Sequence, residues 1–249
     1  MGSQVSSVED LSPKLESWEG PNHVALILHN VFSPEECQSL IERSEKHGYE
    51  PALVNIGSGA QMRMDEIRSS NRSIIDDPIL AQEIWSRIRK IINDDPKLLA
   101  PTWTPMFGKF EAVGLNERLR FLRYDQGHFF STHQDGTYIR KHEAGESRVG
   151  ERSLITCQLY LNEGFIGGST GFESYHDRNH LRYDVIPKMG SILLFEHGLN
   201  HEGATLIEGR KYVIRTDVMY TDRGSPDYET DPIVLRSHED EDGTYYDST

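Results

Sequence analysis

Apolar and polar residues are arranged differently in the first and second parts of the chain, and the difference predicts two kinds of secondary structure. HVALILHNVF, residues 23–32, packs aliphatic residues between polar ends, which is typical of a strand. A helix start follows: Ser33 as the N-cap, Pro34 at the first helical position and Glu36 completing an S-x-x-E capping box. Gly48 is a suitable stop, so we expect a helix between Pro34 and Gly48.

A second helix is predicted over DDPILAQEIWSRIRKIIN, residues 76–93. Its apolar residues recur at close to i, i+4 spacing behind an Asp-Asp-Pro start, so they form one packing face. These positions are Ile79, Leu80, Ile84, Trp85, Ile88 and Ile91. Between the two helices, residues 54–72 carry glycine, serine and charged residues without a clean period. We expect a long mobile loop there, and loops of that length are often lids.

Short strand-like runs dominate from about residue 115 onward, namely RLRFLRY, SLITCQLYLN, GSILLFE and KYVIRTDVMY. Turns that contain glycine and asparagine separate them. Two helices followed by a set of strands predict an α+β, mainly β fold whose strands form a sandwich or jelly roll. We place one domain over residues 23–222, between a polar lead-in at 1–22 and an acidic C-terminal tail at 223–249.

Composition and charge narrow the classes of function. Hydrophobic residues make up 36% and charged residues 27%, which is a globular composition. The net charge of −14 argues against non-specific binding to nucleic acid or to anionic membranes. No stretch approaches the ~18 apolar residues of a membrane span, and no secretory signal begins the chain. We therefore expect a cytoplasmic protein.

Two smaller features bear on the cellular setting. Cys37 and Cys157 are the only cysteines in the sequence, too few for a disulfide framework, and they fit a reducing compartment. The N-terminus matches the M-G-x-x-x-[ST] pattern of N-myristoylation, with Gly2 and Ser6. Chance or an expression scar is the favoured explanation of that match.

The candidate chemistry lies in FLRYDQGHFFSTHQDGTY, residues 121–138. His133 and Asp135 are two residues apart, so on a strand their side chains point to the same face. A lone H-x-D pair is weak evidence of a metal site. His197 and His201, after the apolar run GSILLF, each offer a third ligand. Two histidines and one carboxylate with open positions suit non-haem Fe(II) in oxygenases.

Basic residues follow these histidines on the next predicted strand. An oxygenase that uses 2-oxoglutarate needs a cation for the distal carboxylate of that cosubstrate, and Arg210, Lys211 and Arg215 are the candidates. If Lys211 faces inward, strand alternation places Val213 and Arg215 on the same face and Arg210 on the other.

The order of these motifs resembles that of a known family. H-x-D, then H-x-G, then a basic residue ten positions after that histidine is similar to the prolyl 4-hydroxylase-like branch of the Fe(II)/2-oxoglutarate dioxygenases. RYDQGHFFSTHQDG, RSLITCQLYLNE and GGSTGF also resemble segments of that family. The resemblance implies a double-stranded β-helix (jelly roll, cupin-like) with supporting N-terminal helices.

The resemblance also assigns roles to residues. It makes His133, Asp135 and His201 the iron ligands, and it prefers His201 to His197 because His201 stands in the H-x-G motif. Lys211 becomes the partner of the distal carboxylate of 2-oxoglutarate, and Arg215 remains its competitor. Tyr124 and Tyr160 become pocket-lining groups, with core packing as the alternative. The implied cofactors are Fe(II) and 2-oxoglutarate, and the family admits ascorbate as well.

The substrate is the least determined part of the prediction. The resemblance implies hydroxylation of a prolyl residue of a peptide or protein, with O₂ as the oxidant. A small-molecule or free amino acid hydroxylase and a catalytically silent jelly-roll binding module are the alternatives. Several residues are candidates for contact with substrate or for a lid, with ordinary loop solubility as the alternative. They are Arg63, Arg68, Arg72, Tyr138 and Arg140.

Overall fold

The computed structural model describes residues 7–19, 23–55, 61–93, 110–140, 148, 150–174, 181–222 and 245–246. The helices are α1 (Ser12–Glu19), α2 (Pro34–His47) and α3 (Pro78–Asn93). The strands are β1 (Ser7–Asp10), β2 (Ala25–His29), β3 (Glu50–Pro51), β4 (Val54–Asn55), β5 (Gln61–Met62), β6 (Arg68–Ser69), β7 (Asn71–Asp76), β8 (Phe110–Leu115), β9 (Arg118–Tyr124), β10 (Phe129–His133), β11 (Thr137–Tyr138), β12 (Arg152–Tyr160), β13 (Ile166–Gly167), β14 (Thr170–Glu173), β15 (Arg182–Val185), β16 (Ile192–Glu196), β17 (His201–Gly203), β18 (Leu206–Glu208), β19 (Lys211–Asp222) and β20 (Tyr245–Tyr246).

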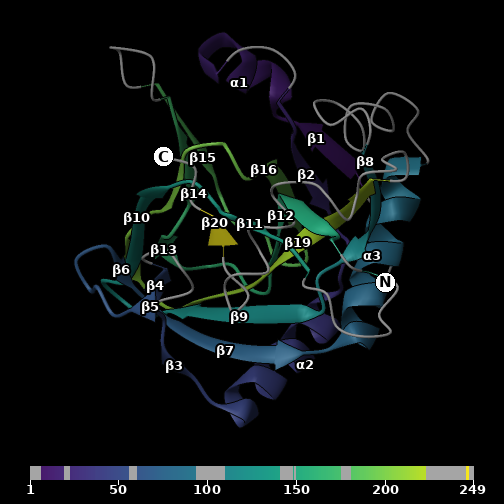
Figure 1. The fold of residues 1–249 in the computed structure, drawn as a ribbon. Helices are drawn as coiled ribbons and strands as arrows, with labels where there is room; N and C mark the ends of the chain where they lie inside the picture. Colours follow the sequence, from purple (N-terminus) through teal and green to yellow (C-terminus); the bar gives the residue numbers. More distant parts are fainter. Residues whose placement is uncertain are drawn as a thin grey trace.

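Two sheets make up the body of the fold (Figure 1). The major sheet has the order β1-β2-β16-β12-β19-β9-β7-β3, and β8 pairs with the far end of β19. The minor sheet has the order β15-β14-β17-β10-β6. Strands of both sheets contribute to one apolar cluster, which includes Tyr160 and Phe195 from the major sheet and Phe172 and Val185 from the minor sheet. The two sheets therefore pack face to face, with this cluster between them.

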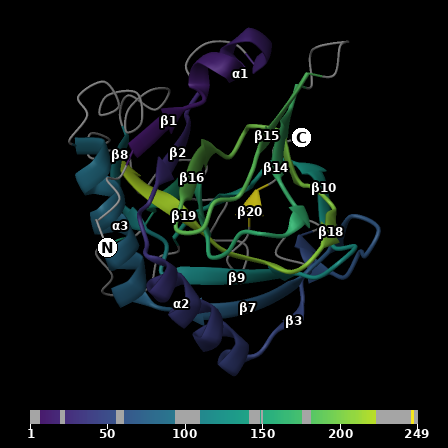
Figure 2. The ribbon, with the colours of Figure 1, turned by 180° about the vertical axis from the view of Figure 1, so that it is seen from behind.

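A second apolar core covers the outer face of the major sheet. Ile84 and Ile88 of α3 pack there with Leu28 of β2 and Phe121 of β9. Figure 2 shows α2 and α3 along this outer side of the sheet. Strand alternation explains why the sheet has two apolar faces, since Leu28 belongs to the outer core and its neighbour Ile27 to the inner one.

The predicted helices are confirmed, together with the start of α2. The Ser33 side chain accepts a hydrogen bond from the Glu36 backbone N–H, and the Glu36 carboxylate accepts one from the Ser33 N–H, at 3.2 and 2.7 Å. This is the capping box that the sequence predicts. Arg87 of α3 also donates to the Glu36 carboxylate, at 2.5 Å. The cap of one supporting helix is thereby tied to the other.

Two segments depart from the expectations. Residues 7–19 fall in the predicted lead-in, yet β1 pairs with β2, and Leu11 and Leu15 are buried. The predicted loop at 54–72 contains β4, β5, β6 and the start of β7, because short ladders to β10 and β9 satisfy its backbone groups. Such two-residue strands are too short to leave a period in the sequence.

Some expectations concern parts of the chain outside the described residues. Gly2 and Ser6 of the myristoylation pattern lie there. Of the predicted acidic tail, only β20 is described after residue 222, and it pairs with β11. None of the described helices is long and apolar enough to cross a membrane.

We expect the stability of the fold to depend on the outer core. Phe121→Ala removes a fully buried ring, so it should lower the free energy of unfolding by about 3–5 kcal/mol. Ile79→Ala is the control, because Ile79 is 82% exposed on α3, and its effect should stay within about 0.5 kcal/mol. Urea unfolding measures both values, and equal losses would contradict this account of the core.

Candidate metal centre and its pocket

Two adjacent strands of the minor sheet bring the two candidate histidines together. His133 is the last residue of β10 and His201 the first of β17, and they face each other in the antiparallel ladder. Asp135 does not lie on a strand, which corrects the argument from alternation. Its backbone N–H donates to the His197 carbonyl at 3.0 Å and is not part of a strand ladder. This bond holds the turn after β10 close to the segment that leads into His201.

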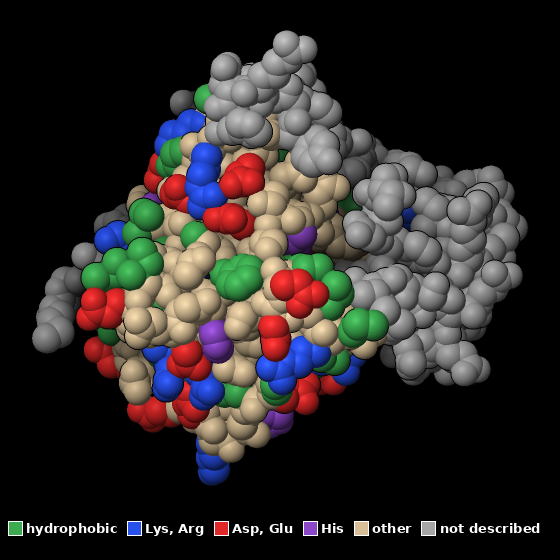
Figure 3. Space-filling model, turned by 90° about the vertical axis from the view of Figure 1, so that its left-hand side faces the viewer, with side chains coloured by type: hydrophobic (Ala, Val, Ile, Leu, Met, Phe, Trp, Pro, Cys, Tyr) green, Lys and Arg blue, Asp and Glu red, His purple; other side chains and the backbone are tan. Residues whose placement is uncertain are grey.

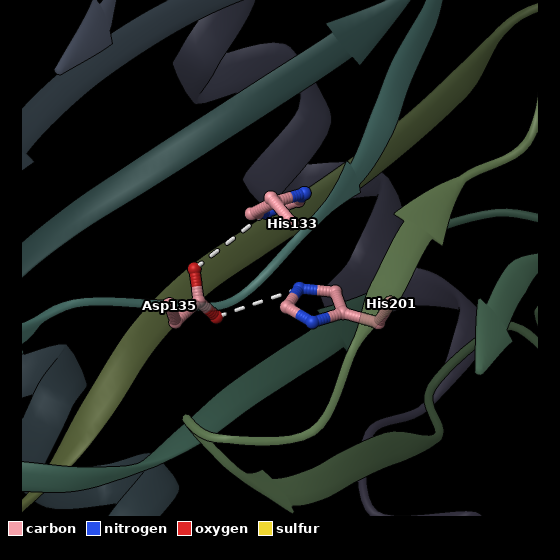
Figure 4. Close-up of side chains that lie close together, drawn as sticks. All are labelled: His133, Asp135 and His201. Atoms are coloured by element: carbon pink, nitrogen blue, oxygen red, sulfur yellow. Dashed lines mark ion pairs between the residues drawn. The ribbon is translucent and has the colours of Figure 1, made fainter. Parts of the chain in front are cut away.

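The three side chains converge on one point (Figure 4). His133 Nε2 lies 3.8 Å from Asp135 Oδ1, and His201 Nε2 lies 3.6 Å from Asp135 Oδ2. One ligand atom from each residue falls within 4.8 Å of the other two. These three residues are therefore a candidate metal site, built from the H-x-D pair and the histidine of the H-x-G motif.

Hydrogen bonding fixes the chemical form of both imidazoles. His133 Nδ1 donates to the Ser131 carbonyl at 2.8 Å, and His201 Nδ1 donates to the Leu199 carbonyl at 2.9 Å. Because a carbonyl only accepts, the Nε2 atoms that face Asp135 carry the lone pairs. Burial lowers the pKa of His133 to about 3 and also lowers that of His201. Both rings are therefore neutral and ready to bind a cation.

The Asp135 carboxylate is held by groups on the major sheet. Arg215 Nη2 on β19 lies 3.1 Å from Oδ1, and the Thr156 hydroxyl on β12 donates to Oδ2 at 2.5 Å. Burial alone would raise the pKa of Asp135, but the Arg215 guanidinium holds it well below its usual value. The ligand thus stays ionised in a buried site.

Arg215 belongs to a larger buried charge network. Its guanidinium also lies 3.0 Å from Asp217, which is fully buried. Arg120 Nη1 and His197 Nε2 lie 3.7 and 3.4 Å from the same carboxylate. We did not predict these partners from the sequence, although alternation along β19 places Asp217 on the face of Arg215. The structure thus places His197 in a contact behind the site, not in the metal cluster.

A cavity of about 440 Å³ opens beside the three candidate ligands. Its size is within the range of small-ligand sites, roughly 300–1,000 Å³. The apolar part of its lining consists of Leu53, Val54, Met64, Ile67, Leu122, Phe130 and Val213. The charged part consists of Arg68, Arg72, Arg120, Lys211, Arg215, Asp135 and Glu202. Lys211, Val213 and Arg215 all face the cavity, as alternation along β19 predicts.

Lys211 occupies the floor of this cavity. It is 3% exposed, and its ammonium donates to the Gly168 carbonyl at 2.7 Å. The Nζ atom lies 5.3 Å from the ring centroid of Tyr124 and 5.6 Å from that of Tyr160. Burial lowers the pKa of Lys211 to about 7, since no carboxylate in the described part of the chain forms an ion pair with it. A buried cation in this state is prepared to receive an anion.

The two tyrosines predicted to line the pocket differ in position. Tyr124 lines the cavity. Tyr160 packs beside Lys211 but outside the cavity lining, and its hydroxyl shares a hydrogen bond of 2.8 Å with Thr170. Arg210, on the opposite face of β19, is an outward residue that binds Asp125 at 2.5 Å. Of the three basic candidates, Lys211 is thus the one whose cation faces the cavity without an acidic partner among the described residues.

The predicted substrate or lid residues lie in different surroundings. Arg72 lines the cavity, where its Nε lies 3.2 Å from Glu50. Arg63 lies outside the lining and is exposed, with Asp65 at 2.8 Å. Tyr138 is on β11, whose strand partner is β20. Of the predicted substrate or lid residues, Arg68 and Arg72 are the ones in the cavity lining.

Arg140 has surroundings that contradict the prediction of a substrate contact. It is buried, it donates to both oxygens of Glu117 at 2.6 and 2.8 Å, and its Nε donates to Glu151 at 3.3 Å. Hydrogen bonding from Arg140 lowers the pKa of Glu117 to about 2. Arg140 also lies outside the cavity lining. The position of Arg140 after the H-x-D motif does not predict these partners. Glu117 lies far from it in the sequence, in the connection between β8 and β9.

Comparison with known proteins agrees with this geometry. Residues 119–216, which contain the three candidate ligands as well as Lys211 and Arg215, match the 2OG-Fe(II) oxygenase superfamily. The probable prolyl 4-hydroxylase 10 of Arabidopsis thaliana is 27% identical over 218 residues, which covers 79% of this chain and 68% of that protein.

The chain is also similar to solved structures, one of which has a TM-score above 0.5 and shows the same fold. A prolyl hydroxylase from Trichoplax adhaerens, in complex with a peptide fragment of the hypoxia inducible factor oxygen degradation domain, has a TM-score of 0.53 at 16% identity. The match covers 85% of this chain and 88% of that one. HygX from Streptomyces hygroscopicus, solved with nickel and 2-oxoglutarate, has a TM-score of 0.48 at 15% identity and covers 96% of each chain.

The protein contains a 2OG-Fe(II) oxygenase region at residues 119–216. It has the predicted mainly β jelly-roll fold with a few helices, and it is an enzyme whose cofactors are Fe(II) and 2-oxoglutarate. The donor set fits the metal, because two neutral imidazoles and one ionised carboxylate leave open positions for cosubstrate and O₂. The family match and the complete set of three candidate ligands favour an enzyme over the alternative of a silent binding module.

We expect Lys211, not Arg215, to bind the distal carboxylate of 2-oxoglutarate. Lys211→Met should weaken 2-oxoglutarate binding at least about 30-fold, since truncating one partner of a buried charge pair costs about 2–5 kcal/mol. Arg215→Gln should change this affinity much less and weaken metal binding instead, because Arg215 contacts Asp135. Calorimetric titration of both variants with Mn(II) and 2-oxoglutarate separates the effects. The reverse order would transfer the anchor role to Arg215.

The lowered pKa of Lys211 predicts a pH dependence of cosubstrate binding. In the free protein this pKa is about 7, so Lys211 loses its charge as the pH rises from 7 to 8.5. Binding of the dicarboxylate then requires uptake of a proton, and the dissociation constant should rise by up to about tenfold per pH unit. Lys211→Arg keeps its charge over this range, so its affinity should vary less with pH. A flat profile for the natural chain would contradict the prediction.

Proposed function

We propose that this enzyme hydroxylates a prolyl residue of a peptide or protein. The overall reaction converts a substrate C–H bond, 2-oxoglutarate and O₂ into the C–OH product, succinate and CO₂. The observation that carries the proposal is the 27% identity with a probable prolyl 4-hydroxylase over 79% of this chain.

The cavity supports a prolyl substrate on chemical grounds. Its apolar part includes Leu53, Val54, Met64 and Ile67, which come from the segment that precedes and enters β6. A pyrrolidine ring is apolar and lacks a donor, so contact with this part of the lining leaves no polar group of the ring unpaired. The segment lies opposite β19, which carries the predicted anchor of the cosubstrate.

Each polar residue near the cavity has a defined task in this reaction. His133, Asp135 and His201 would hold Fe(II), which together with 2-oxoglutarate and O₂ supplies the oxidising chemistry when bound. Lys211 would bind the distal carboxylate of 2-oxoglutarate, which orients the keto-acid end toward the metal. Arg215 contacts one oxygen of the Asp135 carboxylate and Thr156 donates to the other, and together they hold the carboxylate facing the two histidines.

Aromatic and aliphatic side chains pack around the two candidate histidine ligands. Phe130 stacks on the His133 ring with centroids 3.7 Å apart, and Phe195 lies edge-on to His201 with centroids 4.5 Å apart. Leu122 and Val213 line the cavity from neighbouring strands. These contacts fix both imidazole rings before any ligand binds, and pre-organised ligands lower the cost of binding metal.

The proposal is tested by product analysis. Purified enzyme with Fe(II), 2-oxoglutarate and O₂ should add one oxygen atom to the proline of a prolyl peptide and release one succinate per oxygen added. Mass spectrometry with fragmentation locates the added atom. His201→Ala should abolish both products, whereas His47→Ala, whose imidazole bonds Ser73 at the end of α2, should retain them.

A matched panel of free amino acids and other small metabolites decides between substrate classes. If a small molecule drives succinate formation with stoichiometric hydroxylation while prolyl peptides do not, the prolyl proposal is wrong and the small-molecule alternative replaces it.

A further inference from the structure

The cavity carries more positive charge than its described acidic residues and the cosubstrate neutralise. Arg72 contacts Glu50, Arg215 contacts Asp135, and Arg120 Nη1 lies 3.7 Å from Asp217. Glu202, which also lines the cavity, forms an ion pair with Arg182 at 2.7 Å. Lys211 is the predicted partner of the distal carboxylate of 2-oxoglutarate. One further cation, Arg68, remains to be explained.

Arg68 has polar and aromatic neighbours but no acidic ion-pair partner within the described ranges. Its Nε donates to the Ser70 hydroxyl at 3.1 Å, and its guanidinium lies near the Tyr124 side chain. The guanidinium carbon lies 4.5 Å from the Phe130 ring centroid. Burial lowers the pKa of Arg68, with the nearby cations Arg215 and Arg72 adding to the effect.

This arrangement holds the guanidinium fork open toward the cavity. Ser70 uses the inner Nε, and Phe130 supports the planar group from one side. Removing a cation from bulk water without a counter-charge is unfavourable by several kcal/mol. A guanidinium that lines a ligand cavity in this state is matched to a carboxylate, which it binds in a bidentate way.

The position of Arg68 favours an anion on the substrate over a second role for the cosubstrate. Arg68 lies on β6, the edge strand of the minor sheet, opposite Phe130 in the ladder. Lys211 lies on β19 of the major sheet, across the cavity. The Tyr124 side chain stands between the two, with its ring near Lys211 and its hydroxyl near Arg68. The two cations therefore serve different anions.

We propose that the substrate carries a carboxylate close to the target residue and that Arg68 binds it. Under the proposed function, on which this inference rests, the substrate is an acidic peptide with Asp or Glu within about two residues of the proline. One aromatic ring, Phe130, separates the guanidinium from the His133 imidazole, and an extended peptide advances about 3.3 Å per residue. The carboxylate and the target proline therefore come from nearby positions.

The surface beside the cavity does not offer a general attraction for anions. Figure 3 views the side of the molecule on which β6 and β10 lie, and acidic and basic side chains alternate over it without a large patch of one sign. The chain as a whole has a net charge of −14. Recognition of an acidic substrate group therefore depends on the Arg68 guanidinium inside the cavity and not on long-range electrostatic attraction by the surface.

Binding measurements test the inference without requiring turnover. The protein is loaded anaerobically with Mn(II) and 2-oxoglutarate and titrated with two acetylated peptide amides that differ in one residue, Pro-Asp against Pro-Asn. The acidic peptide should bind at least tenfold more tightly. Arg68→Gln should abolish this preference, and Arg68→Lys should retain part of it because the charge remains. Arg63→Gln is the control, since Arg63 is exposed and paired with Asp65 in the same segment.

The outcomes separate this inference from the proposed function. Equal affinity for the two peptides, or a preference that survives in Arg68→Gln, overturns the role of Arg68. A fall of 2-oxoglutarate affinity in Arg68→Gln comparable with that in Lys211→Met would make Arg68 a cosubstrate residue and also overturn it. A clear acidic preference without hydroxylation of either peptide upholds the anion site while the prolyl assignment fails. Unchanged 2-oxoglutarate affinity shows that each variant is folded.

Discussion

The contact between Arg215 and Asp135 is the interaction on which the site depends. A carboxylate must be ionised to bind a metal, yet burial between two sheets favours its neutral form. Arg215 lies 3.1 Å from Asp135 and 3.0 Å from Asp217, so one guanidinium keeps two buried carboxylates charged. Removing it would leave the buried Asp135 carboxylate without its cationic partner, which is strongly destabilising.

This ion network also explains how the two sheets cooperate. The minor sheet supplies the histidines through the ladder between β10 and β17, while β19 and β12 of the major sheet supply Arg215 and Thr156 for Asp135. The metal ligands are therefore correctly placed only when the sheets pack on each other. The helices on the outer face contribute to the site indirectly, because they pack on the major sheet and stabilise the strands that carry Arg215 and Thr156.

The cations of the cavity fall into two kinds. Arg215 and Arg72 have acidic partners and shape the site, whereas Lys211 and Arg68 face the cavity without such partners among the described residues. Leaving a cation in that state costs folding energy, and a bound anion recovers the cost. These two charges are the ones to which we assign the distal carboxylate of 2-oxoglutarate and, by proposal, the carboxylate of the substrate.

The sequence by itself determined what depends on local or repeating patterns. The cap of α2, the face of α3 and the long strands of the major sheet follow from capping and alternation, and the order of motifs placed His133, Asp135 and His201 in one candidate site. Short strands such as β6 were not predictable, because two residues carry no period. Only the tertiary structure decided that Arg140 pairs with Glu117, since such a choice depends on which distant side chain lies within a few ångströms. The same holds for Arg68, whose open guanidinium exists because packing brought it to the cavity and brought no acidic partner among the described residues with it.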